Sequence, residues 1–218
     1  SQQISSNKNK EANYTQNRAL GFSILLTLPA AIAIFILANP IISCFFERGE
    51  FISQDRILAA KALQAFAVGI PAYVFVKVLT PAFFARKNTV TPVKIASFCV
   101  LINFLLNIIL MQYYQHVGIA MATAIASWTN AFLLFLVLYK SRQVEIDEKL
   151  KKLVSKVTII SIIFGYIVFY FKDLIDISSD YKLFYLIIFV LIGMFFFGIL
   201  CLFFRIFKFS DLKLIKKN

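Results

Sequence analysis

The sequence predicts an all-α membrane protein, a polytopic transmembrane helix bundle with six spans. Hydrophobic residues make up 60% of its 218 residues, 25 residues are Phe, and mean hydropathy is +0.80. Only 16% of the residues are charged, whereas soluble domains carry about a quarter. The apolar runs also lack the polar–apolar alternation that marks the strands of a membrane barrel. These features exclude a water-soluble domain and favour membrane-spanning helices.

Six windows are apolar and long enough for a helix to cross a bilayer, which takes about 20 residues. They lie at residues 21–44, 57–85, 93–114, 117–139, 154–172 and 182–204. The last two are rich in Ile and Phe and hold almost no polar group at their centres. We therefore expect five segments: a cytoplasmic segment (1–20), four transmembrane helices of one lobe (21–140), a charged cytoplasmic linker (141–156), two lipid-facing transmembrane helices (157–206) and a basic cytoplasmic tail (207–218).

The distribution of Lys and Arg predicts how these helices are oriented. Seventeen of the 23 basic residues fall in segments on one side of the alternating spans, and four fall on the other side. Because cytoplasmic loops are rich in Lys and Arg, we expect both ends of the chain to be cytoplasmic and residues 45–51 (FFERGEF) to face outward. The net charge of +12 then reflects topology and contact with anionic lipids, and we expect no nucleic-acid partner.

No set of side chains suited to catalysis stands out. The single histidine, His116, lies in a short connection between apolar windows, and the three cysteines are scattered through apolar runs without metal-ligand spacing. The acidic residues lie almost wholly outside the windows, which argues against a membrane hydrolase and against a simple proton-relay pump. We expect neither an enzyme nor an organic cofactor.

Lys77 is a charged residue inside the second apolar window, nine residues before Arg86, or about 13 Å along a helix. A charge at such a depth is by default a sign of a functional site, and a cation there would suit an anionic substrate in a central cavity. Two structural readings stay open. The lysine stem can reach toward the interface, or the ammonium group can pair with a neighbouring helix.

Asn103 and Asn107 are four residues apart and therefore lie on one face of the third span. Thr123 on the fourth span is placed to face them, because the connection QYYQHVG between the two spans is short. Their oxygen atoms would suit a hard cation such as sodium. The alternative is hydrogen bonding between helices, which the small residues of GIAMATAIA would assist by allowing close approach.

Several phrases of the sequence together resemble a known family. They are LPAAIAIFILANPII followed by FERGEF, then ALQAFAVGIPAYVFVKVLTPAFFARKNTVTPVKIA, and then HVGIAMATAIASWTNAFLLFLVL. These phrases resemble the C-terminal part of the MurJ/MviN lipid II flippases, within the multidrug/oligosaccharidyl-lipid/polysaccharide exporter superfamily. The resemblance is close over residues 20 to 140. For the last two spans it rests on position and apolar composition only.

The resemblance implies that the chain corresponds to the last six helices of a fourteen-helix protein of the bacterial cytoplasmic membrane. The last two helices would help to form a groove for the polyprenyl tail of the substrate. By the same resemblance, Glu47 and Arg48 lie in an outward-facing turn near the outer gate of the cavity, where Gly49 permits a tight reversal. A turn with no role beyond connecting two helices is the alternative reading.

The resemblance also places Asn103, Asn107 and Thr123 where some family members bind sodium. One departure bears on affinity, because Asn stands at 107, where an acidic side chain would bind a cation better. The family's essential cavity arginines lie mainly in its first eight helices, which this chain lacks. We therefore expect those eight helices, membrane lipids and a lipid-linked peptidoglycan precursor as partners.

The function implied is that of the C-terminal portion of a lipid II flippase, which moves an undecaprenyl-pyrophosphate-linked precursor from the inner to the outer leaflet. One alternative is export of another polyprenyl-linked polysaccharide, or of drugs, within the same superfamily. Another is a remnant of a split gene that no longer transports. The sequence encoded immediately upstream would separate these readings, since eight further helices with intramembrane arginines would favour the flippase.

Overall fold

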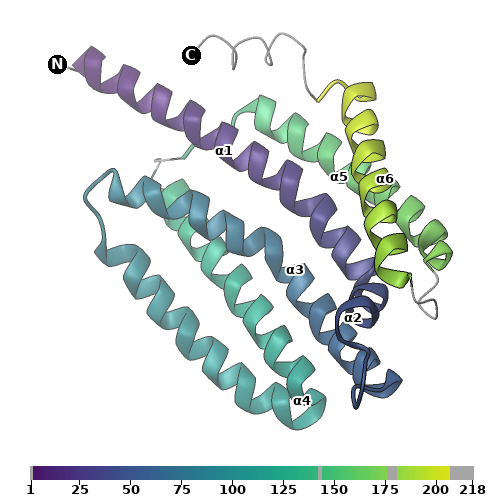
Figure 1. Cartoon of the computed structure of the whole chain (residues 1–218). Helices are drawn as coiled ribbons and strands as arrows, with labels where there is room; N and C mark the ends of the chain where they lie inside the picture. The colour runs from purple at the N-terminus through teal and green to yellow at the C-terminus, as the bar shows by residue number, and fades with distance from the viewer. Residues whose placement is uncertain (1, 142–143, 176–180, 207–218) are drawn as a thin grey trace.

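The computed structural model describes residues 2–141, 144–175 and 181–206, with side chains from residue 11 onward, and all of its regular structure in these ranges is helical (Figure 1). The predicted all-α class is therefore confirmed. The elements, in chain order, are α1 (Gln2–Ile36), α2 (Ala38–Phe46), α3 (Ser53–Phe84), α4 (Val90–Lys140), α5 (Glu148–Phe171), a 3-10 turn η1 (Lys172–Leu174) and α6 (Lys182–Phe203).

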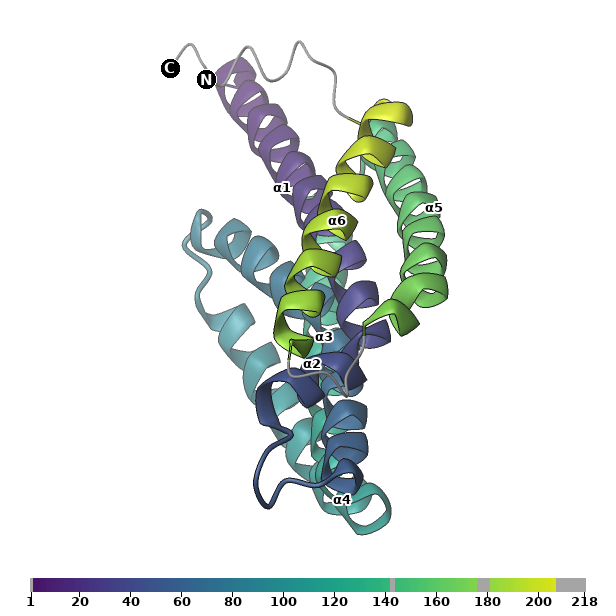
Figure 2. The same cartoon turned by 45° about the vertical axis from the view of Figure 1, so that its right-hand side comes forward.

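The first predicted span is divided in the structure. Helix α1 ends at Ile36, and α2 begins at Ala38 after a break at Leu37, whose backbone departs from helical geometry. Pro40 lies at the third position of α2 and has no N–H to donate, so the helix cannot run through this point with unbroken hydrogen bonds. The break turns α2 toward the start of α6, which it contacts (Figure 2).

Helix α4 holds two of the six predicted spans. Its 51 residues include Gln115, whose φ of 51° and ψ of −133° lie outside the helical region, and the chain reverses there (Figure 1). The two arms, 90–114 and 116–140, then run antiparallel. A Cβ at Gly118 would overlap the carbonyl oxygen of Leu110, so the close approach of the arms at this point requires glycine.

Helix α1 lies between α3 on one side and α5 on the other, and α4 packs on the far side of α3 (Figure 1). Small residues allow α3 and α4 to come close: a Cβ at Gly69 would lie 3.3 Å from the Cα of Ala124. Where α1, α3, α4 and α5 meet, a buried cluster includes Leu79, Phe83 and Leu138. A second cluster joins the end of α1 to α5 and α6.

Two parts of the bundle expose most of their apolar side chains. Helix α6 has the highest hydropathy of the described helices, and only 11% of its most apolar window is buried in the chain. The first arm of α4 is also uncovered, with Val100 and Phe104 among its exposed residues. Within the part of the chain that the structure describes, five helices are long and apolar enough to cross a membrane, with α4 counted as one. These surfaces need lipid or further helices to cover them.

The domain limits expected from the sequence remain predictions. The structure shows α1 already helical across residues 2–20, and α5 begins at Glu148, inside the charged segment 141–156. The tail from residue 207 lies outside the described residues.

Candidate functional site

The turn between α2 and α3, residues 47–52, is organised around Glu47. Both carboxylate oxygens of Glu47 accept hydrogen bonds from Nη1 of Arg56, at 3.0 and 2.9 Å, and the hydroxyl of Ser43 donates to Oε2 at 2.5 Å. The backbone carbonyl of the same residue accepts from Nζ of Lys182 at 3.3 Å. Glu47 therefore links the end of α2, the first turn of α3 and the start of α6.

The carboxyl group of Glu47 is held in its charged form. The hydrogen bond from Ser43 and the nearby guanidinium of Arg56 lower the pKa of Glu47 below its ordinary value, against partial desolvation that acts in the opposite direction. Both members of the ion pair have about a fifth of their side-chain surface exposed. Charge-assisted hydrogen bonds are stronger than those between neutral groups, and both partners here are mostly shielded from water.

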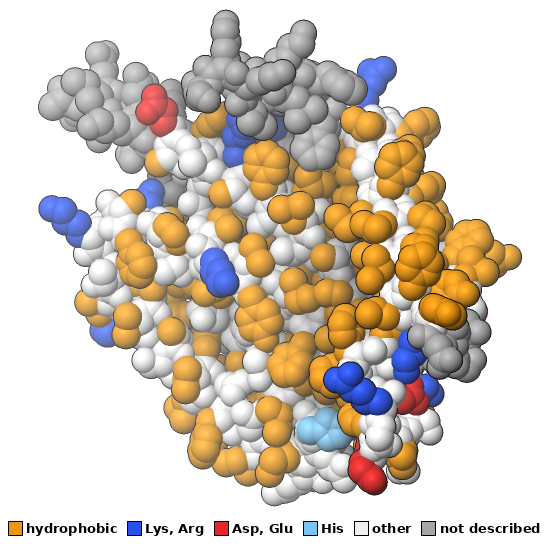
Figure 3. Space-filling view, viewed as in Figure 1, with side chains coloured by type: hydrophobic (Ala, Val, Ile, Leu, Met, Phe, Trp, Pro, Cys, Tyr) orange, Lys and Arg blue, Asp and Glu red, His pale blue; other side chains and the backbone are white. Residues whose placement is uncertain are grey.

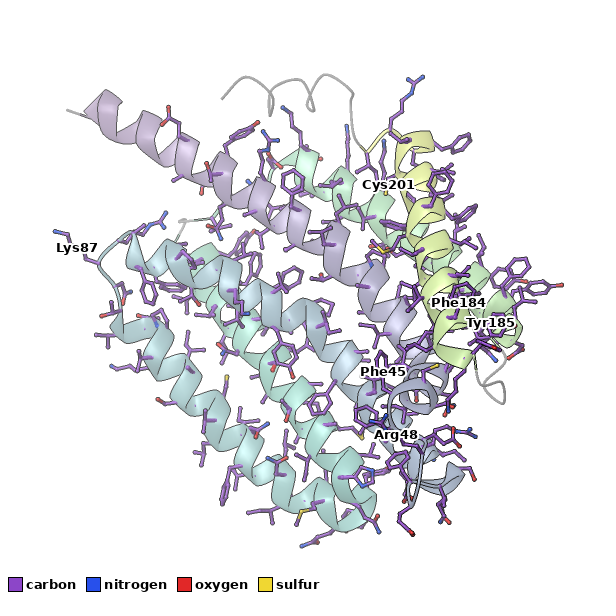
Figure 4. The ribbon with its side chains drawn as sticks, in the orientation of Figure 1. Phe45, Arg48, Lys87, Phe184, Tyr185 and Cys201 are labelled. Atoms are coloured by element: carbon purple, nitrogen blue, oxygen red, sulfur yellow. The ribbon has the colours of Figure 1, made fainter. Side chains whose placement is uncertain are left out.

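Arg48 and Glu50, the other charged residues of the turn, are exposed, and neither forms an ion pair with another described residue. Arg48 lies on the turn beside the start of α6, where Phe184 and Tyr185 project from the molecule (Figure 4). Gly49 has a φ of +59°, which glycine adopts without strain. The tight reversal expected at Gly49 is therefore present, and the role of Arg48 at a gate stays a prediction.

Lys77 lies in the second half of α3 with an exposed side chain, and the structure records no hydrogen bond or ion pair for it. The reading in which Lys77 pairs with a neighbouring helix of this chain thus finds no support among the described residues. The helical repeat places Phe66, Ile70 and Phe84 on the same side of α3 as Lys77. The ammonium group stands alone on an otherwise apolar stripe.

Asn107, Asn103 and Thr123 form one chain of hydrogen bonds between the two arms of α4. Nδ2 of Asn107 donates to Oδ1 of Asn103 at 2.9 Å, and Nδ2 of Asn103 approaches Oγ1 of Thr123 at 3.4 Å. The threonine hydroxyl donates to the carbonyl of Ile119 at 2.8 Å. The structure thus brings together the three residues grouped from the sequence.

An acceptor is left over at one end of this chain of hydrogen bonds. Oδ1 of Asn107 is buried and has no hydrogen-bond partner among the described residues. An unpaired buried oxygen carries a free-energy cost, and a cation would relieve it. The described residues contain no group of three or more His, Cys, Asp or Glu side chains placed to hold a metal, so a cation here would depend on neutral oxygen ligands.

Comparison with known proteins identifies the family. The family model described as lipid II flippase MurJ matches residues 1–190 of the chain. The chain belongs to the MurJ family. It is 39% identical over 182 residues to a probable lipid II flippase MurJ of Rickettsia prowazekii, and the match covers 82% of this chain and 36% of that protein. It is 40% identical over 129 residues to a MurJ of the same description from Rhizobium meliloti, covering 59% of this chain and 24% of that one.

A solved structure agrees with these matches. The structure described as lipid II flippase MurJ, inward closed conformation, superposes with a TM-score of 0.74 at 31% identity and covers 92% of this chain and 41% of that one. The chain spans little more than a third of the length of the Rickettsia MurJ protein. This partial coverage fits the expectation of a C-terminal piece of a MurJ protein.

A second lysine of α3 was not predicted from the sequence as a candidate site residue. Lys61, like Lys77, lies within the second apolar window and is exposed on α3. The two lysines are 16 residues apart, which places them on roughly opposite sides of the helix, about 160° apart at 100° per residue. The sequence already shows Lys61 as a second charged residue inside this window, in QDRILAAKALQAF, five residues after Arg56. The structure adds that both side chains are exposed.

Proposed function

We propose that this chain is the C-terminal portion of a lipid II flippase, and that the complete flippase moves an undecaprenyl-pyrophosphate-linked peptidoglycan precursor from the inner to the outer leaflet. The observation that carries the proposal is the MurJ family match over residues 1–190. Flipping makes and breaks no covalent bond. The protein has to shield a large anionic headgroup from lipid while the polyprenyl tail stays in the membrane, because a charge at the bilayer centre is costly.

Lys77 supports this function through its position and its lack of a partner. A lysine in the interior of an apolar helix is costly unless it meets protein, water or a counter-charge. Its side chain is exposed and forms no hydrogen bond or ion pair with another described residue. We assign it to the wall of the transport cavity, where the ammonium would meet the pyrophosphate of the precursor.

The uncovered arm of α4 supports the need for further helices. Large apolar residues such as Val100, Leu101 and Phe104 are exposed there, and only 6% of the most apolar window of α4 is buried. We infer that the eight N-terminal helices of a complete flippase, together with lipid, cover this arm. Those helices would also supply the opposite wall of the cavity.

We further propose that the protein resides in the bacterial cytoplasmic membrane with both ends of this chain in the cytoplasm. Support comes from the basic residues, of which seventeen lie on the side of the two ends and four on the other. The turn around Glu47 would then face outward. Sodium is the one ion that we propose as a ligand, at Asn103, Asn107 and Thr123.

The proposed function can be tested by exchanging segments. A gene in which this chain replaces the matching segment of the Rhizobium meliloti MurJ should sustain growth of a bacterium depleted of its own flippase. A matched chimera in which the same segment carries Gly118→Ala, which would disturb the reversal of α4, serves as the negative control. Failure of the first chimera despite normal membrane levels would count against the proposal.

A further inference from the structure

A cavity of about 730 Å³ lies at the end of the bundle that carries the turn 47–52. It is bounded by the end of α1, the start of α2, the first part of α3, the end of α5 and η1. Figure 3 shows basic and acidic side chains gathered at this end of the molecule, below the hydrophobic side chains that cover α6. The volume is in the range of known small-molecule sites.

The polar lining of the cavity contains two cations. Arg56 and Lys172 both line it, together with the amides of Asn39 and Gln64 and the carboxylate of Asp173. Lys172 donates to Asp173 at 2.8 Å, but Asp173 is largely in solvent, with 85% of its side chain exposed. The screening of that exposed pair leaves the ammonium available to a second anion.

Arg56 has unused donors. Its recorded bonds to Glu47 all come from Nη1, while its Nε is buried and has no partner among the described residues. A guanidinium presents five N–H donors in a planar fork that matches carboxylate and phosphate oxygens. Because Nε is fully buried, the nitrogen left for a ligand oxygen in the cavity is Nη2, which donates to no described residue.

The remaining walls are apolar. They come from Phe35 and Ile36 at the end of α1, Ile57 on α3, and Phe169 and Ile175 around the end of α5. The cavity thus combines two cations with apolar side chains, and Nζ of Lys172 lies 5.2 Å from the centroid of the Phe169 ring. This is the division that an amphiphile needs, with a charged head held by Arg and Lys and a chain packed against hydrocarbon.

We propose that this cavity binds the phosphodiester headgroup of an anionic phospholipid, with Arg56 and Lys172 on the phosphate oxygens and the first part of an acyl chain against Phe35, Ile57 and Phe169. The site is separate from Lys77, which lies 21 residues further along α3, or about 30 Å away. It therefore does not depend on the proposed transport of lipid II. Such a lipid would fasten α1, α3 and α5 together beside the turn.

The test is a titration of the purified protein, in a neutral detergent, with dioctanoyl phosphatidylglycerol, followed by thermal unfolding. Two matched compounds divide the lipid into its parts: dioctanoylglycerol has the chains without the phosphate, and glycerol phosphate has the phosphate without the chains. We expect saturable stabilisation by phosphatidylglycerol only. Three outcomes would overturn the proposal. Equal stabilisation by dioctanoylglycerol would show a purely apolar pocket, and equal stabilisation by glycerol phosphate would show a general anion site. Absence of saturable stabilisation by phosphatidylglycerol would show that there is no site.

Three variants locate the effect. Lys172→Met should raise the half-saturating lipid concentration roughly tenfold, the loss expected for one charge-assisted hydrogen bond. Glu47→Gln, which removes the carboxylate that competes for Arg56, should leave that concentration unchanged or lower it. Lys61→Gln removes the same charge from α3 outside the cavity lining and should have no effect. The assignment would be contradicted if Lys172→Met left the half-saturating lipid concentration unchanged, or if Lys61→Gln raised it as much as Lys172→Met does.

Discussion

Arg56 holds Glu47 with a single nitrogen, Nη1, which donates to both carboxylate oxygens at 3.0 and 2.9 Å. The pair joins the two ends of the turn that reverses the chain between α2 and α3. Lys182 binds the carbonyl of the same glutamate from the start of α6. Within FFERGEF, Glu47 therefore has a structural role beyond its contact with water, because it connects three helices at one end of the bundle.

The energy of this pair can be measured by a double-mutant cycle with Glu47→Gln and Arg56→Gln. We expect a coupling of about 1 kcal/mol, more than an open surface pair provides, because both side chains are mostly sheltered. The measurement is thermal unfolding of the four proteins in the same detergent. Lys151 with Glu148, an exposed pair on α5, is the matched control, and equal coupling in both cycles would show that shelter adds nothing.

The same pair predicts a dependence of stability on pH. The pKa of Glu47 is lowered in the folded protein from its ordinary value of 4.5. Its contribution is therefore present above that value and is lost as the pH falls through the lowered folded pKa. The stability advantage of the native protein over Glu47→Gln should shrink as the pH drops below 4.5. An advantage that grows in acid would reverse the sign and refute the assignment.

Gly118 tests the reversal of α4. A Cβ there would overlap the carbonyl oxygen of Leu110 and approach the backbone N of Met111 to 2.9 Å. Since backbone atoms cannot move aside cheaply, Gly118→Ala should destabilise the protein by roughly 2 kcal/mol. Gly198→Ala is the control: a Cβ at Gly198 on α6 meets nothing within 4 Å, so thermal stability should stay the same or rise. Similar losses in both variants would argue against the hairpin.

Lys77→Met should impair growth rescue by the segment-exchange protein, while Lys77→Arg should retain part of it, because arginine keeps the positive charge. Lys61→Met is the matched control, since Lys61 is also exposed on α3 but lies on another side of the helix. Membrane levels should be equal in all three variants. Full rescue by Lys77→Met would show that Lys77 has no role in transport and that its stem only reaches toward the membrane interface.

The sodium site is tested by ion-dependent thermal stability, with potassium as the comparison. Three neutral side chains should bind sodium weakly, because charged ligands supply most of the attraction for a hard cation. Asn107→Asp should therefore strengthen the response to sodium, and Asn103→Leu should abolish it. If neither substitution changes the response, the hydrogen bonds between the arms of α4 serve packing alone.

Orientation is tested by labelling single cysteines from outside the cell, after removal of Cys44, Cys99 and Cys201, which are all free thiols. We expect a cysteine at position 50 to react and one at position 145 to be protected. The opposite pattern would overturn the topology that the basic residues predict.

Much of the fold could be predicted because the backbone of a long apolar segment in lipid must satisfy its own hydrogen bonds, which a helix does. The division of the first span was missed, since Pro40 lies inside an otherwise continuous apolar run. The partners of charged side chains were also out of reach. Glu47 is paired across a turn with Arg56, nine residues away, and no local period of the sequence links such positions. Asn103 and Asn107 could be grouped because helical spacing fixes their common face.

The most direct measurement of the proposed function is the amount of lipid II exposed on the outer face of the membrane. Cells depleted of their own flippase would carry the chimera of this chain with the Rhizobium meliloti MurJ, and an externally added enzyme that cleaves lipid II would report the exposed fraction. The account predicts cleavage comparable to that in cells with the unmodified Rhizobium protein. Protection of lipid II from cleavage, with the chimera present at normal levels in the membrane, would contradict it.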